Sequence, residues 1–225
     1  MRLEILRCRA CGAPLKADPA DAMARCGHCR AGHQIIGSSA VAVSEAAVAP
    51  PAAAAVDQWL PLWLVEFQVA AADIERLPPR SVFQPHPDES VPPPDPPAPL
   101  ALDQRQALLV PAFGTTNFVN YSSNLGLELS GRWDGRDLSP APRDAPWPLC
   151  RYGSLDARGM APVLLRLLVN KRERDVIGLE FEPVWIRERL IWWPFAVDGD
   201  CLRDLLFGVR VLRSAIASDP TPADA

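Results

Sequence analysis

The chain has 225 residues, a formal net charge of −4 and an apolar share of 48%, which suits one medium domain with an appendage or two small domains. The mild negative charge argues against a protein that coats nucleic acid through bulk positive charge. We see no secretory leader and no run of about 18 uncharged apolar residues, so we expect a cytoplasmic protein without a membrane span.

Four of the six cysteines lie near the N-terminus in two Cys-x-x-Cys pairs, with residues 12–25 between the pairs. Two such pairs at this separation are typical of metal sites. Each turn places two thiolates on one side of an ion, and four thiolates satisfy the tetrahedral preference of zinc. The expected ligands of one structural Zn²⁺ are Cys8, Cys11, Cys26 and Cys29.

The flanking segments 3–8, 22–26 and 32–37 are expected to be short strands that lead into and out of these turns. The stretches "CRACGAPL" and "CGHCRAGH" resemble those of a zinc ribbon, a small all-β module, over residues 1–37. The resemblance implies that the same four cysteines bind one zinc ion. Arg30 stands where many zinc ribbons have glycine.

Two histidines close to the turns, His28 and His33, could also bind a metal. With four thiols present, we expect them to support the ligands or to lie in solvent instead. A rubredoxin-like iron site and a pair of disulfides are the alternatives, although a reducing compartment favours metal over disulfides. A closed site with four cysteine ligands has no vacant position for a substrate, so it stabilises a fold and does not catalyse a reaction.

Segments of biased composition divide the rest of the chain. Residues 38–57 are rich in alanine and proline and predict a flexible linker. The sequence contains 25 prolines, about twice the usual frequency of ~5%, and their densest cluster predicts an extended loop over residues 77–100. We expect an α+β body over residues 58–218 and a disordered tail over residues 219–225.

Within the body, aromatic and β-branched residues predict strands and apolar spacing predicts one or two helices. We expect strands at 58–71 and 105–114, then helices at 115–130 and 154–174. We expect an antiparallel C-terminal meander at 176–186, 188–197 and 201–212. The Asp198-Gly199 pair is a strong hairpin signal. Pro162 fits the first turn of the second helix if that helix begins near Ala161.

The body offers few candidates for chemistry. His86 lies in the proline-rich loop, which suits preorganisation poorly. Cys150 and Cys201 are expected to be buried apolar thiols. Glu180 and Glu182 alternate on one predicted strand, where a solvated face is the commoner cause of such a pair.

Adjacent Trp192 and Trp193 must face opposite sides of a strand. One ring can therefore join the core, while the other meets solvent, a helix or a partner, as interface aromatics do. A homo-oligomer formed through the tryptophan-rich sheet is one expectation that follows.

These features favour a non-enzymatic adaptor or accessory subunit of a larger bacterial assembly, with a zinc ribbon and a body that each contact a protein. The first alternative is a zinc-ribbon protein that binds nucleic acid. Against it, residues 1–37 carry six basic and three acidic side chains, and zinc with four thiolates adds two negative charges. The second alternative is a rubredoxin-like electron carrier or an enzyme subunit.

Overall fold

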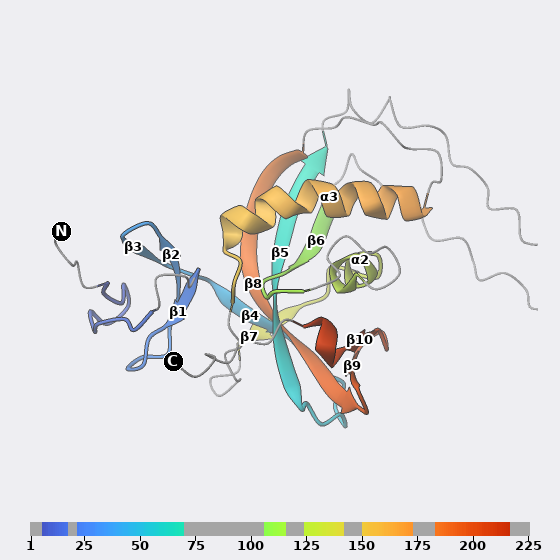
Figure 1. Cartoon of the computed structure of the whole chain (residues 1–225), viewed down its shortest axis with the longest axis horizontal. Helices are drawn as coiled ribbons and strands as arrows, with labels where there is room; N and C mark the ends of the chain where they lie inside the picture. The colour runs from blue at the N-terminus through green and yellow to red at the C-terminus, as the bar shows by residue number, and fades with distance from the viewer. Residues whose placement is uncertain are drawn as a thin grey trace, which may run out of the picture.

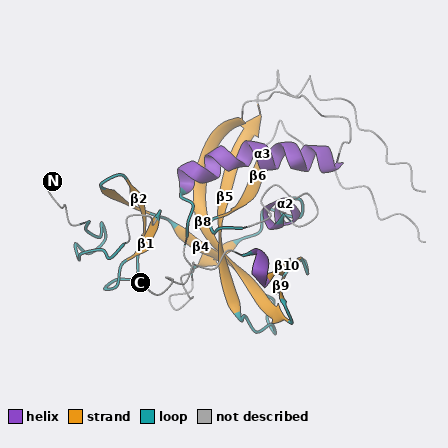
Figure 2. Ribbon diagram, viewed as in Figure 1, coloured by secondary structure: helices purple, strands orange, loops and turns teal. Residues whose placement is uncertain are grey.

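Most of the regular secondary structure belongs to two β-sheets, in a computed structural model that describes residues 6–17, 22–69, 106–115, 124–141, 150–172 and 183–216. The fold is α+β with a majority of strands, which confirms the predicted class. Among the described residues, helices are confined to two α-helices and one short 3₁₀ turn (Figure 1). Figure 2 shows the longer helix lying across the long, curved strands of the larger sheet.

The smaller sheet follows the first cysteines and has three antiparallel strands in the order β1-β2-β3. They are β1 (Met23–Arg25), β2 (Gly32–Ile36) and β3 (Ser39–Ala42). We call residues 6–17 and 22–42 the cysteine module.

The larger sheet is built on two long antiparallel strands, β5 (Gln58–Val69) and β8 (Pro183–Asp198). On the far edge of β5 lies β6 (Gln106–Pro111). The other edge of β8 is shared by four short strands. They are β4 (Glu45–Val48) with its partner β7 (Leu138–Pro140), and β9 (Cys201–Asp204) with its partner β10 (Arg210–Leu212). The pair of β4 and β8 is parallel.

Both faces of the larger sheet are covered. Helix α3 (Ser154–Arg172) lies across β5, β6 and β8 on one face (Figure 1). The other face packs against α2 (Leu125–Ser130) and the 3₁₀ turn η1 (Arg213–Ala215), in a core that also includes side chains of β9 and β10. Because β8 alternates its side chains between these faces, Trp192 joins the core beneath α3 and Trp193 joins the second core.

Both tryptophans are fully buried, at 0% exposure. One ring was expected to meet solvent, a helix or a partner. Trp193 instead lies in a core of this chain, against Trp133 and Phe207 at centroid distances of 5.8 and 5.9 Å. Neither ring is available as a contact surface. A homo-oligomer that uses these rings as anchors is therefore not supported, and the oligomeric state stays a prediction.

The structure differs from the sequence prediction over residues 38–57. This segment contains β3 and β4, and β4 is inserted between β7 and β8 with Ala47 and Val48 each 1% exposed. Alanine is a poor strand former, but its small side chain fits between the large residues of neighbouring strands, and packing overrides the local preference. The cysteine module is therefore joined to β4 by Val43 and Ser44 and not by a long flexible linker.

The C-terminal strands are partitioned differently from the prediction. The segments predicted at 176–186 and 188–197 belong to one strand, β8, wherever they are described, and the segment at 201–212 forms two strands, β9 and β10. The hairpin between β8 and β9 is confirmed, with Gly199 at a φ of 59° in the first loop position after the Asp198–Cys201 pair. A positive φ there requires glycine in practice.

Helix α3 begins at Ser154, so Pro162 lies inside it and not in its first turn. The helix predicted at 115–130 instead begins at Leu125, because Asn124 is its extended N-cap and accepts a hydrogen bond from the Leu127 amide. Thr115 lies in a β-bridge with Ile216. Within the described residues, no helix is long and apolar enough to cross a membrane. The proline-rich loop 77–100, the tail 219–225, His86, Glu180 and Glu182 lie outside the described residues.

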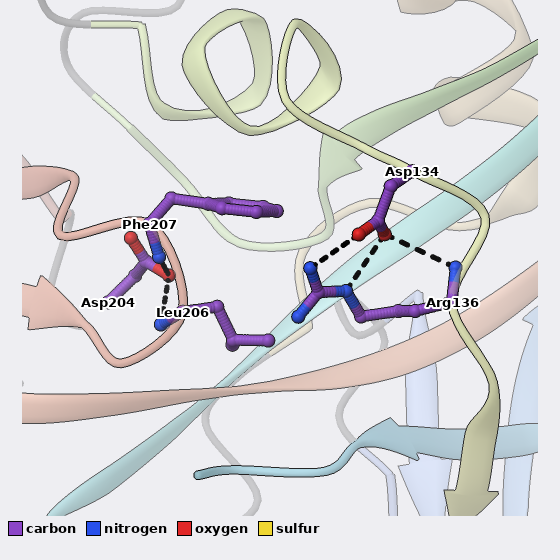
Figure 3. A network of polar contacts seen from close by, with 5 residues as sticks. All are labelled: Asp134, Arg136, Asp204, Leu206 and Phe207. Atoms are coloured by element: carbon purple, nitrogen blue, oxygen red, sulfur yellow. Dashed lines mark hydrogen bonds and ion pairs between the residues drawn. The ribbon is translucent and has the colours of Figure 1, made fainter.

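A buried carboxylate, Asp204, shapes the loop between β9 and β10 (Figure 3). It is 0% exposed and accepts hydrogen bonds from the indole of Trp193 and from the amides of Leu206, Phe207 and Val209. These four donors replace the water that burial removes. On the facing loop, Asp134 binds Arg136 in a two-bond ion pair, and the Arg136 guanidinium lies 4.9 Å above the Phe207 ring.

Candidate metal centre

The two cysteine turns share one backbone pattern. In the first turn, Cys8 donates its amide to the Ala13 carbonyl at 2.8 Å, and Gly12 donates to the Cys8 carbonyl at 2.9 Å. The second turn repeats both bonds, from Cys26 to Ala31 and from Arg30 to Cys26, each at 2.9 Å. Each turn therefore projects its two thiols from the same rigid frame.

Gly12 and Arg30 occupy equivalent positions, with φ angles of 75° and 67°. Arg30 is the non-glycine residue with a positive φ among the described residues. The carbonyl groups of both positions accept a bond from an arginine that precedes the turn: Arg7 donates to Gly12 at 3.2 Å and Arg25 to Arg30 at 2.9 Å. The conformation demanded at position 30 explains why glycine is usual there in the family that the sequence resembles.

The structure brings the four predicted sulfur atoms together, all within 4.8 Å of one another. The Sγ atoms of Cys8 and Cys29 are 3.5 Å apart, and those of Cys11 and Cys26 are 3.6 Å apart. A tetrahedral zinc site with Zn–S bonds of ~2.3 Å places its sulfurs about 3.8 Å apart, whereas a disulfide requires about 2.05 Å. The four free thiols therefore fit a metal ion and are too far apart for disulfides.

The protein environment favours a thiolate at one of these positions. The amides of Cys29 and His28 and the neighbouring thiols lower the pKa of Cys26 from 9.0 to about 6. At Cys11 the amide of Ala13 acts in the same direction, but burial and the three neighbouring thiols outweigh it and raise the pKa to about 12. A compact group of four thiols thus resists losing all of its protons unless a cation compensates the charge.

His33 is not among the residues that could hold the ion. It is fully buried, its Nε2 accepts a hydrogen bond from the Arg9 amide at 3.0 Å, and its Nδ1 lies 3.1 Å from the Ala31 carbonyl oxygen. The ring therefore links the first cysteine turn to the second, which matches the expected supporting role. His28 is exposed.

Sequence reasoning missed the apolar cover of the cluster. Leu15 and Ala40 are buried beside Cys8 and Cys26, and Ile35 packs against them. The alternation of β2 carries the signal, because His33 and Ile35 face the cysteines while Gln34 faces the other way. The sequence "GHQII" contains this pattern, but only the position of the strand shows which face it covers.

The remaining two cysteines lie apart from the cluster. Cys150 is 3% exposed in the core beneath α3, as predicted. Its burial, together with the charge of Glu45, raises the pKa of its thiol. Cys201 is only half-buried, at the start of β9.

Comparison of the chain with protein-family models, with curated proteins and with solved structures gives no match.

Proposed function

We propose that the chain is a non-enzymatic adaptor in which Cys8, Cys11, Cys26 and Cys29 hold one zinc ion in a zinc-ribbon-like module that contacts a protein partner. The observation that supports the zinc assignment is the sulfur geometry, since four soft donors lie within 4.8 Å of one another and two of their pairs are 3.5 and 3.6 Å apart. When bound, zinc supplies folding energy to a module too small to bury a sufficient core.

An apolar surface beside the module supports the second half of the proposal. Ile36 and Val41 are 42% and 47% exposed on the β2–β3 face that points away from the cysteines. Leu155, in the first turn of α3, is 58% exposed and follows Ser154, whose amide contacts Gln34 of the same face. Exposed apolar side chains that share one face of neighbouring strands, as Ile36 and Val41 do, favour contact with a protein.

Metal analysis of the purified full chain tests the zinc assignment. We expect one zinc per chain, no visible absorption band and release of the metal after acidification. Stoichiometric iron with an absorption band in the visible region would contradict it and would favour the rubredoxin-like alternative.

The adaptor role is tested with the double variant Ile36→Ser and Val41→Ser. We expect it to retain zinc and to lose one or more proteins that co-purify with the wild-type chain from its native cells. The variant Val197→Ser is the matched control, since Val197 is 48% exposed at the far end of β8. An identical set of co-purifying proteins from both variants would contradict the proposal.

One observation favours nucleic acid as a second candidate. Residues 1–37 carry six basic and three acidic side chains, an excess of three cations. The basic residues that the structure describes there are Arg7, Arg9, Lys16, Arg25 and Arg30. Binding through these cations would weaken steeply with salt, because counterions are released from the phosphates. Gel-shift measurements between 50 and 200 mM salt, with single- and double-stranded probes, test this candidate, and no salt-dependent binding would exclude it.

A further inference from the structure

The cysteine module is attached to the body through the start of α3. Gln34 of β2 is only 6% exposed, and its Oε1 accepts a hydrogen bond from the Ser154 amide at 3.2 Å. Gly153 permits this approach, because a Cβ atom there would lie 2.5 Å from Nε2 of Gln34. The first turn of α3 therefore depends on a side chain 120 residues earlier in the sequence.

The amide groups at the start of a helix have no partner within the helix and need one elsewhere. Here Asp156 accepts a hydrogen bond from the Gly153 amide at 2.8 Å, and the Gly153 carbonyl accepts one from Ala157 at 3.0 Å. The Ser154 amide is left to Gln34. The start of α3 is thus capped from two sides, by Asp156 of the helix itself and by Gln34 of the cysteine module.

A second connection is apolar. Met23 of β1 is 4% exposed and belongs to the same core as Ala157 and Trp192. The strand that carries Met23 is followed directly by Cys26. One end of β1 therefore lies in the core beneath α3, while the other leads into the cysteine cluster.

We propose that metal occupancy of the four cysteines controls the order of the first turn of α3. The inference rests on the proposed function only in taking the cluster to bind a metal. Strand β2 carries both ends of the connection, with His33 and Ile35 toward the cysteines and Gln34 toward α3. When the module loses its metal and unfolds, Gln34 leaves the Ser154 amide and Met23 leaves the core.

The proposal has a consequence for the apolar surface of Ile36, Val41 and Leu155. Two of these residues belong to the module and the third to the turn that the module caps. The three side chains therefore form one surface only in the metal-loaded protein. Binding of a partner there would depend on metal supply.

Hydrogen–deuterium exchange of the full chain, with and without its metal under reducing conditions, tests the coupling. We expect peptides over residues 153–160 to exchange about tenfold faster after chelation, because the turn opens more often. Peptides over residues 204–209, whose amides are held by Asp204, are the internal control and stay protected. Unchanged exchange over residues 153–160 would overturn the proposal.

If the metal-free chain unfolds completely, a matched pair of variants tests the same connection in the metal-loaded protein. Gln34→Ala removes the acceptor, and we expect about five- to tenfold faster exchange of the Ser154 amide in the metal-loaded protein, as for loss of a helix cap. Gln34→Glu retains an acceptor oxygen and restores protection. Equal exchange in wild type and Gln34→Ala would overturn the proposed connection.

These results are separable from the adaptor role. If Ile36→Ser and Val41→Ser leave the co-purifying proteins unchanged while Gln34→Ala still loosens α3, the coupling stands and the adaptor proposal fails. Loss of the co-purifying proteins with no change over residues 153–160 would support the adaptor role and overturn the coupling.

Discussion

Arg30 holds a left-handed backbone conformation, with a φ of 67°, that disfavours every residue with a Cβ atom. We expect Arg30→Gly to raise the unfolding free energy of the metal-loaded chain by about 1 kcal/mol, since relief of the strained angle exceeds the entropy that glycine adds to the unfolded state. Arg30→Ala is the control, because it removes the same side chain but keeps the strain. Urea titrations in which Arg30→Gly is no more stable than Arg30→Ala would refute the expectation.

Cys150 should resist alkylation although it is a free thiol. Burial raises its pKa, so its neutral form stabilises the fold below the usual thiol pKa of ~8.5, and this contribution is lost as the pH rises above that value. Between pH 7 and 9 we expect iodoacetamide to modify the half-buried Cys201 and to leave Cys150 intact. Peptide mass spectrometry checks this, and equal modification of the two thiols would contradict it.

Among single residues, the sequence predicted the cluster of four cysteines but not the contact made by Gln34. Metal ligands are recognisable because each Cys-x-x-Cys turn is a local geometry that its own spacing encodes. The role of Gln34 depends on Ser154, and nothing near either residue indicates the pairing. A buried polar side chain needs a hydrogen-bond partner, and the partner of Gln34 lies far from it in the sequence.

Helix α2 covers the free edge of β6. Ser130 accepts a hydrogen bond from the Leu109 amide at 2.8 Å, which satisfies a donor that the edge would otherwise expose. Gly126 makes the approach possible, because a Cβ atom there would lie 2.6 Å from the Leu109 carbonyl oxygen and 2.9 Å from the Pro111 ring. The contact is thus set by backbone atoms that cannot rotate away.

Gly126→Ala should therefore lower the unfolding free energy by about 1–3 kcal/mol through overpacking. Gly159→Ala in α3 is the matched control, since its added Cβ would meet no atom within 4 Å beyond its chain neighbours and the backbone of its own helix. There we expect a gain of up to about 1 kcal/mol from helix propensity. Equal shifts in the thermal midpoints of the two variants would show that the close contact is not decisive.

The loop between β9 and β10 depends on one carboxylate. Asp204→Ala leaves the Trp193 indole and three backbone amides without their acceptor, and we expect a loss of about 2–4 kcal/mol. Asp204→Asn keeps one acceptor oxygen but turns a donor toward the amides, so its loss should be intermediate. Chemical unfolding followed by circular dichroism gives both values, and a loss below about 0.5 kcal/mol for Asp204→Ala would argue against this role.

Three elements were predictable from local patterns, while the alanine-rich β4 was not and the long β8 was predicted as two strands. Strands β5 and β6 and helix α3 carry enough large apolar residues for their patterns to be read locally. By contrast, β4 has the sequence "EAAV", whose small side chains give little signal until Ile191 and Trp192 lie beside them. The strands beside β4, rather than its own sequence, determine that it forms a strand.

Over the whole molecule, the cysteine module and the body should unfold together. Three connections fix the module against the body. They are the two-residue link at Val43 and Ser44, the burial of Met23 and the Gln34–Ser154 hydrogen bond. We expect the change in circular dichroism and the release of metal to a chelating dye to coincide on heating. Metal release at a clearly lower temperature, with the body unchanged, would show two independent units.

The double variant Cys8→Ser and Cys11→Ser gives the complementary result. Loss of the helix cap and of the buried methionine should lower the thermal midpoint of the body by about 5–10 °C. An unchanged midpoint is what a tethered module would give. The sequence did not predict this coupling of the module to the body, because the composition of residues 38–57 does not indicate that β4 pairs with a strand more than 140 residues later.

Adjacent Trp192 and Trp193 also limit which insertions and deletions this chain can accept during evolution. Since β8 supplies both cores with alternate side chains, inserting or deleting a single residue near its centre would exchange the two faces of everything beyond that point. Large rings would then meet spaces shaped for other side chains on both sides at once. Length changes are expected to accumulate in the connections, while the interior of β8 evolves by substitution alone.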